Sequence, residues 1–105
     1  MNKVHLAGKI SRVGQLKYSP SGLALLEFTL AVGQEAYSKT SIGYYQVVVS
    51  DRQAEDLKGQ LKIGMNVTVD GHLYQRAYTS RSGTKVDEIK VILEIHMVQL
   101  MIYQI

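Results

Sequence analysis

The sequence contains no cysteine and no tryptophan, and only one proline and one phenylalanine among its 105 residues. Without cysteine the chain forms no disulfide, offers no thiol nucleophile and lacks every cysteine-ligated metal site. No apolar run approaches the ~20 residues of a membrane span, and the first residues lack the apolar core of a signal peptide. These absences predict a soluble, cytoplasmic protein without a membrane contact, and the length predicts one domain over residues 1–105.

Tyrosine and a small excess of positive charge are what the sequence has instead. There are seven tyrosines, and 12 Lys and Arg residues against 9 Asp and Glu residues give a formal net charge of +3. An excess of this size permits a polyanionic partner but does not require one.

Apolar and polar residues alternate in five stretches, which is the pattern of half-buried strands. The stretches cover residues 4–10, 26–32, 45–49, 65–73 and 85–103. Ser19–Gly22 and Ser80–Gly83 have the composition of turns, and the second turn is expected to join two strands as a hairpin. The segment 33–43 is expected to be a polar loop.

One segment has a helical pattern. Ser50 followed by Gln53 fits a capping box, and apolar residues then recur at helical spacing, at Ala54, Leu57 and Leu61. A helix between the third and fourth of five strands is the element order of the OB-fold, a barrel that binds oligonucleotides or oligosaccharides. The sequence therefore predicts an all-β, five-stranded OB-fold barrel with one short helix between strands 3 and 4.

Two tyrosines flank an arginine where the alternation of the fourth predicted strand is followed past Leu73. Tyr74, Arg76 and Tyr78 share one face with Asp70 and His72, because alternate side chains of a strand point the same way. Aromatic rings stack on bases at ~1–3 kcal/mol each, and a cation between them can meet phosphate. Tyr44 is the better candidate for the exposed face of the third strand, since Tyr45 continues the apolar alternation. The same pattern also fits an ordinary solvated sheet face.

Further candidates lie outside this stripe. Other residues that could contact a nucleic acid are Tyr37, Lys39, Arg52, Lys62 and Arg81, with Arg12 and Lys17 as additional cations along a phosphate path. No glycine-rich phosphate loop is present, and the three histidines have no metal-ligand spacing. We therefore expect no cofactor, no metal and no enzyme activity. A small metal-dependent nuclease stays open as an alternative, because a barrel could gather carboxylates.

At this point the chain resembles the bacterial single-stranded DNA-binding protein family over roughly residues 2–101, with the primosomal replication protein N branch as its short relative. The segments that carry the resemblance are Tyr18–Gly22, Phe28–Ala31, Tyr44–Val49, Val67–Leu73 and Tyr78–Gly83. The resemblance implies that three positions stack on bases. The family has tryptophan there, whereas this chain has Tyr37, Tyr44 and Tyr78. It also implies that Arg76, Arg52 and Lys62 lie in or beside segments that contact the DNA backbone.

The leading prediction is a protein that binds single-stranded DNA without strong sequence preference, in DNA replication, recombination or repair. RNA stays open as a ligand, since ring stacking tolerates either sugar. The alternative is an OB-fold adaptor that joins proteins of a replication or primosome complex and binds nucleic acid weakly. The resemblance implies a homo-oligomer, either a tetramer or a dimer, paired through the first strand. Because the chain stops at Ile105, no tail that recruits replication proteins is expected.

Overall fold

The structure is a computed structural model that describes residues 1–93. The part of the last predicted strand that follows Leu93 lies outside the described residues. The elements are β1 (Val4–Val13), β2 (Lys17–Tyr18), β3 (Ala24–Ala36), β4 (Lys39–Ser50), α1 (Asp51–Leu57), β5 (Asn66–Thr79) and β6 (Lys85–Leu93).

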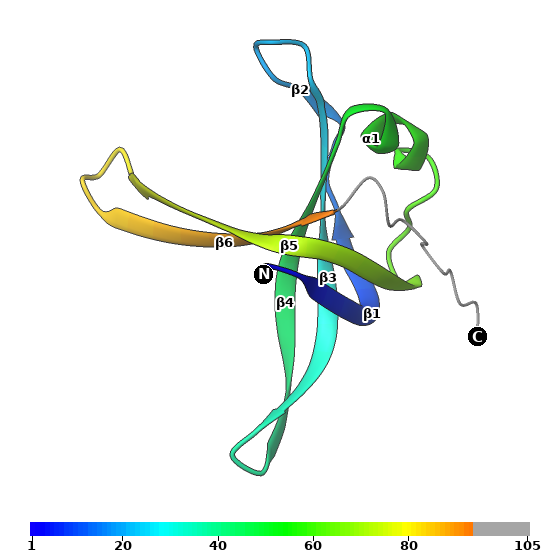
Figure 1. Cartoon of the computed structure of the whole chain (residues 1–105), viewed down its shortest axis with the longest axis vertical. Coiled ribbons are helices and arrows are strands. Elements are labelled where there is room, and N and C mark those ends of the chain that lie inside the picture. The colour runs from blue at the N-terminus through cyan, green and yellow to red at the C-terminus, as the bar shows by residue number, and fades with distance from the viewer. Residues whose placement is uncertain (94–105) are drawn as a thin grey trace.

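Five long strands close into a ring (Figure 1). They are hydrogen-bonded in the order β1-β5-β6-β4-β3, and β1 closes the ring because it pairs with β3 as well as with β5. The strand changes partner near Lys9, and a register shift between Ile10 and Arg12 bends it there. Among the strand pairings of residues 1–93, β4 with β6 is the one parallel pair. The predicted OB-fold barrel with a helix between the third and fourth long strands is confirmed; the two-residue strand β2 beside β3 was not predicted.

The core lies inside the ring, where the apolar positions of the alternating strands meet. Phe28 is 1% exposed and is the largest fully buried side chain among the described residues. The other core residues of the strands are Ile10, Ala24, Leu26, Leu30, Val47, Val49, Val67, Val69 and Val91. The helix α1 covers one end with Ala54 and Leu57, so the helical spacing read from the sequence marks residues that are buried.

Two glycines stand at buried-face positions where neighbouring strands approach closely. A Cβ atom on Gly71 would lie 2.2 Å from the carbonyl oxygen of Ile92, and one on Gly8 would lie 2.3 Å from the carbonyl oxygen of Ala31. No real Cβ atom fits at such a distance, so glycine at these positions permits the strand contacts that close the ring.

Two long hairpins extend beyond the ring, β3–β4 and β5–β6 (Figure 1). The expectation of a polar loop over 33–43 is wrong, because β3 runs to Ala36 and β4 begins at Lys39. The turn between them is only Tyr37 and Ser38, both with positive φ, 55° and 62°. A two-residue hairpin turn with positive φ usually contains asparagine or glycine, so its usual signal is missing from the sequence.

Both predicted Ser-x-Ser-Gly turns are confirmed, and they have the same geometry. The amide of Gly22 donates to the Ser19 carbonyl at 2.8 Å, and the amide of Gly83 donates to the Ser80 carbonyl at 2.9 Å. Each glycine has a positive φ, near 85°. The first serine of each turn also accepts a hydrogen bond at Oγ from the amide that follows the glycine. The second turn therefore fixes the register of the β5–β6 hairpin.

The predicted capping box does not form. Ser50 occupies the N-cap position in an extended conformation, but its side chain makes no capping hydrogen bond. Asp51 has a φ of 61°, so the chain enters α1 through a left-handed residue and the hydroxyl of Ser50 is not aimed at the free amides of the first turn. The side-chain amide of Gln53 is instead buried, and neither its oxygen nor its nitrogen has a partner within residues 1–93.

Candidate nucleic-acid interface

Strand β5 brings Tyr74, Arg76 and Tyr78 together on one face, as the alternation predicts. The Arg76 guanidinium carbon lies 4.8 Å from the centroid of the Tyr78 ring, which is the geometry of a cation–π contact. Both rings are accessible, with Tyr74 51% and Tyr78 41% exposed. On such a face the two exposed rings can stack on bases, and the arginine between them in sequence can meet a phosphate of the same strand.

Strand β4 continues this face. Val48 is the register partner of Ile92 on β6 and of Glu27 on β3, which places Tyr44, Gln46 and Val48 on the same side as the β5 stripe. We call Tyr44, Gln46, Tyr74, Arg76 and Tyr78 the tyrosine face.

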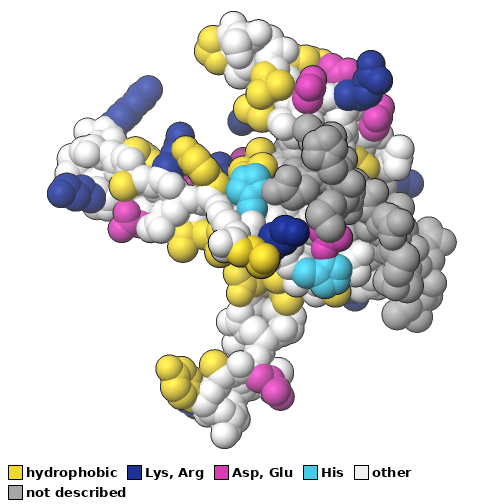
Figure 2. Space-filling model, in the orientation of Figure 1, with side chains coloured by type: hydrophobic (Ala, Val, Ile, Leu, Met, Phe, Trp, Pro, Cys, Tyr) yellow, Lys and Arg dark blue, Asp and Glu magenta, His cyan; other side chains and the backbone are white. Residues whose placement is uncertain are grey.

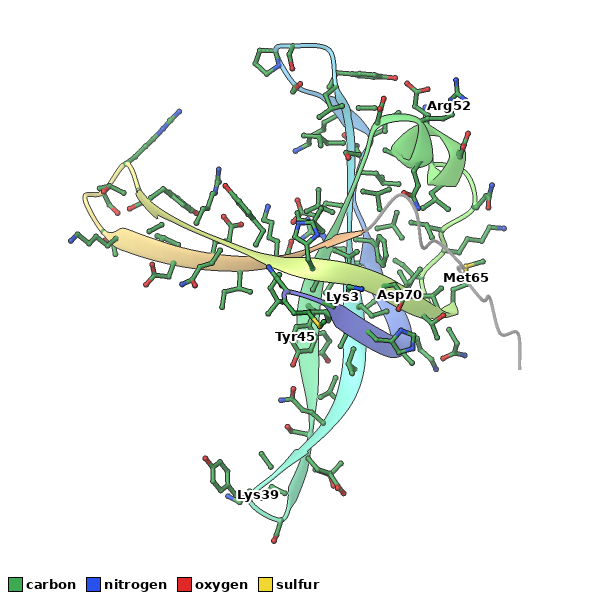
Figure 3. The ribbon with its side chains drawn as sticks, viewed as in Figure 1. Lys3, Lys39, Tyr45, Arg52, Met65 and Asp70 are labelled. Carbon is green, nitrogen blue, oxygen red and sulfur yellow. The ribbon has the colours of Figure 1, made fainter. Side chains whose placement is uncertain are left out.

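Tyr44 and Tyr45 have opposite environments, as expected. Tyr44 is 65% exposed, whereas Tyr45 packs against the core. The Tyr45 hydroxyl also donates to Oε1 of Gln34 at 2.7 Å, which holds this ring against the β3–β4 sheet (Figure 3).

A groove of about 650 Å³ adjoins the tyrosine face. Strands β3 and β4 form its floor with Glu27, Thr29, Gln46 and Val48, and its cationic lining residues are Arg12, Lys17 and Lys90. Figure 2 shows a hollow between the β5–β6 hairpin and the end of the molecule that carries β2, and Lys and Arg side chains project from the tip of that hairpin.

Four charged side chains cross the sheet in a row, which we call the charge ladder. Lys90 Nζ lies 3.3 Å from Glu27 Oε2 and 3.3 Å from Glu88 Oε1, and Arg76 Nε donates to Glu88 Oε2 at 3.1 Å. The hydrogen bond from Lys90 and the one from Arg76 hold the pKa of Glu88 below its ordinary value, against the opposing effect of burial. Glu88 is therefore a carboxylate at neutral pH.

The hairpin tips carry three of the predicted residues. Tyr37 is 99% exposed at the turn between β3 and β4, and Lys39 follows it. Arg81 is exposed in the turn between β5 and β6. The tips of the β3–β4 and β5–β6 hairpins are the ends of two separate arms (Figure 1).

Arg52 and Lys62 lie elsewhere. Arg52 belongs to the first turn of α1, on the opposite side of the molecule from the tip of the β5–β6 hairpin (Figure 3). Lys62 is exposed in the segment between α1 and β5. The structure does not bring these two cations together with the Tyr74–Arg76–Tyr78 stripe.

Within residues 1–93 there is no group of three or more His, Cys, Asp or Glu side chains that could hold a metal ion. The side chains of His5 and Asp70 contact each other across β1 and β5, but they form a pair only. The described part of the chain also has no helix with the length and apolar character needed to cross a membrane.

Sequence reasoning did not place Glu27, Gln46, Glu88 or Lys90 at this interface; it considered Glu27 and Glu88 only among the carboxylates that a nuclease could use. Three of these four positions could have been predicted from the sequence. Alternation from Tyr44 leads to Gln46, and the Ser80–Gly83 turn pairs Arg76 with Glu88 and Tyr74 with Lys90. Glu27 had no such signal, because it reaches Lys90 over 63 residues of sequence.

Comparisons with known proteins show the family to which the chain is related. Residues 1–101 match the model of the family described as "Single-strand binding protein family". The chain is 33% identical over 97 residues to proteins named "Single-stranded DNA-binding protein" from Halalkalibacterium halodurans and Streptococcus pneumoniae, covering 90% of this chain and 58% and 62% of theirs. The chain thus spans about three-fifths of the length of these relatives.

A solved structure supports the fold. The chain titled "Plasmodium falciparum SSB complex with ssDNA" superimposes with a TM-score of 0.83 at 22% identity, over 99% of this chain and 96% of that one.

Proposed function

The chain belongs to the single-strand binding protein family, and we propose that it binds single-stranded DNA without strong sequence preference. The observation that carries this proposal is the tyrosine face, where three exposed rings and one arginine share a single sheet surface beside a groove with cationic walls. Every base has a π-face, so ring stacking accepts any sequence.

The rings favour single strands over duplex. Tyr44, Tyr74 and Tyr78 stand on a sheet and reach only bases that are unstacked and turned outward. Arg76 supplies a charge beside them, and the groove adds Arg12, Lys17 and Lys90. We therefore expect a strand that lies along the tyrosine face with bases on the rings and phosphates toward the groove.

The tips of the hairpins extend the path. Tyr37 and Lys39 would add one ring and one cation at the tip of the β3–β4 hairpin, and Arg81 would add one cation at the tip of the β5–β6 hairpin. Arg52 and Lys62 fit this path only if the strand continues around the barrel past α1. We propose them as outer contacts, weaker than those of the tyrosine face.

We propose that the protein works as a homo-oligomer, a dimer or a tetramer. Residues Val4–Ala7 of β1 pair with β5 on one side, and within residues 1–93 no strand covers their other edge. Two copies that pair these edges about a two-fold axis would satisfy both rows of backbone groups. Two binding faces on one strand also raise the affinity for long DNA.

The role that follows is non-catalytic: the protein coats single-stranded DNA during replication, recombination or repair. Such a role belongs in the compartment that holds the DNA, which in a bacterium is the cytoplasm. The adaptor alternative is not favoured, because the relatives are named for DNA binding and an adaptor has no need of exposed rings beside an arginine.

Titration of a fluorescent oligothymidylate tests the proposal. The wild-type chain should bind it at physiological salt, and a duplex of the same length should bind much more weakly. A double variant, Tyr44→Ala with Tyr78→Ala, should lose most of the affinity while it keeps the circular dichroism spectrum of the wild type. Equal affinity for duplex and single strand, or full binding by the double variant, would refute the proposal.

A further inference from the structure

We propose that Glu88 competes with the phosphates of single-stranded DNA for Arg76 and Lys90, so that this carboxylate lowers the affinity of the tyrosine face and speeds the release of DNA. The inference rests on the proposed function and adds to it a residue that weakens DNA binding. It starts from the two oxygens of Glu88, which engage two different cations, Lys90 at 3.3 Å and Arg76 at 3.1 Å.

Arg76 and Lys90, the two cations of the charge ladder, are already paired with carboxylates in the free protein. The charge ladder contains two cations and two carboxylates, because Lys90 also contacts Glu27 at 3.3 Å. Its net charge is therefore zero. A phosphate that approaches Arg76 meets no excess of positive charge until a carboxylate moves away.

The position of Glu88 makes this competition direct. Its side chain is 27% exposed and that of Arg76 is 56% exposed, so solvent and a bound strand can both reach the pair. The bond from Arg76 uses Nε, only one of five N–H donors on the guanidinium. A phosphate held by the remaining donors would lie beside an ionised carboxylate, and the two like charges would repel each other.

Lys90 is restrained more strongly than Arg76. Its side chain is 22% exposed and lies between two carboxylates, Glu27 from β3 and Glu88 from β6. Removing one carboxylate leaves the other, so Lys90 stays oriented toward the face when Glu88 is neutralised. The gain in phosphate affinity should therefore appear mainly through Arg76.

The strand β6 provides a matched control for the test. Asp87 is the neighbour of Glu88, and alternation places it on the opposite face of the sheet, where its register partner is Ala77. E88Q and D87N remove the same unit of negative charge one residue apart. General electrostatic attraction of DNA would treat the two variants alike, whereas direct competition affects E88Q alone.

We would measure the affinity and the dissociation rate of a fluorescent oligothymidylate for wild type, E88Q and D87N at two or more salt concentrations. E88Q should bind about two- to five-fold more tightly at low salt, the range expected from one exposed ion pair. The change should fall mainly on dissociation. The gain should shrink as salt rises, because salt screens the competing carboxylate as well as the phosphate. The affinity of D87N should stay within a factor of about 1.5 of the wild-type affinity, because an exposed charge that makes no direct contact contributes little.

Each result separates the hypotheses. Equal gains in E88Q and D87N would overturn the competition and leave general charge as the cause. Weaker binding by E88Q would show that Glu88 positions Arg76 for DNA, which also overturns it. If wild type fails to bind the probe at all, the proposed function fails and this inference fails with it. If circular dichroism shows that E88Q does not fold, E27Q would be tested in its place. E27Q frees Lys90 from one carboxylate and should therefore give a smaller gain in affinity for the probe.

Discussion

Replacing Tyr44 and Tyr45 one at a time should separate DNA binding from folding at two adjacent residues of the same type. Tyr44 is 65% exposed and has no core contact to lose. Tyr44→Ala should therefore leave stability within ~0.5 kcal/mol of the wild type, as for ordinary surface substitutions. One stacked base contributes ~1–3 kcal/mol, so the affinity for oligothymidylate should fall about 5- to 140-fold.

Tyr45→Ala should have the reverse effect. The ring packs against the core, and its hydroxyl donates to Gln34 Oε1 at 2.7 Å. Truncating a fully buried aromatic residue costs ~3–5 kcal/mol, and we take about 2 kcal/mol for this half-buried ring. In a domain of this size, that cost lowers the melting temperature by roughly 10 °C. Affinity measured well below the transition should be unchanged.

The assay is fluorescence anisotropy for binding, paired with thermal unfolding followed by circular dichroism. Tyr45→Phe adds a finer control, because it removes only the hydroxyl bond and should cost about 1 kcal/mol. The reasoning is refuted if Tyr44→Ala destabilises the fold as much as Tyr45→Ala, or if Tyr45→Ala weakens DNA binding more than Tyr44→Ala does under native conditions.

Four other predictions follow from the same structure. Arg76→Ala should reduce the slope of log affinity against log salt by roughly 0.7, the value for one single-strand phosphate contact; an unchanged slope and affinity would remove Arg76 from the path. Gly71→Ala should cost about 1–3 kcal/mol in urea unfolding, since its Cβ would lie 2.2 Å from the Ile92 carbonyl oxygen, and wild-type stability would contradict that contact. Sedimentation equilibrium should give a mass of at least two chains; a mass near 11.7 kDa would refute assembly alone. Lys90 and Arg76 lower the folded pKa of Glu88 from 4.5, so its contribution to stability is complete above about that pH and is lost as pH falls through the lowered value. In E88Q the free energy of unfolding should fall less steeply with decreasing pH than in the wild type, and an identical pH dependence would contradict the charge ladder.

Much of the fold could be predicted from the sequence, because the signals for strands and turns lie in residues that are close together in the chain. The alternation of apolar residues identified every long strand, and it assigned Tyr44 to the exposed face although Tyr45 is its neighbour. The two serine-glycine turns were readable because their glycines adopt positive φ, which their sequence favours. These features depend on residues close together in the chain, so one sequence is enough to predict them.

The failures share a different cause. The turn at Tyr37 and Ser38 has positive φ at two residues that rarely adopt it, so the hairpin was mistaken for a loop. The capping box failed because Asp51 changes the direction of the chain before α1 begins. In each case the pairing of β3 and β4, or the packing of α1 on the barrel, prevails over local preference.

The charge ladder shows where prediction from alternation ends. The pairs of Arg76 with Glu88 and of Tyr74 with Lys90 follow from the hairpin turn once its register is counted. The contact of Lys90 with Glu27 requires the parallel pairing of β4 with β6. No local sequence pattern predicts that pairing. A site composed of one readable hairpin and one distant strand is therefore predicted only in part.

Two features of this surface should both lower the affinity of a single barrel for single-stranded DNA. Tyrosine has a smaller ring than the tryptophan implied at the equivalent positions by the family resemblance, so each stacking contact should be weaker. The charge ladder, in turn, leaves Arg76 and Lys90 without excess positive charge. A single barrel should therefore hold a short strand weakly, and tight binding to long DNA requires several linked faces. On this reasoning a variant that stays monomeric should bind a short oligothymidylate as well as the wild type does but lose affinity for a long one, and equal loss on both lengths would contradict it.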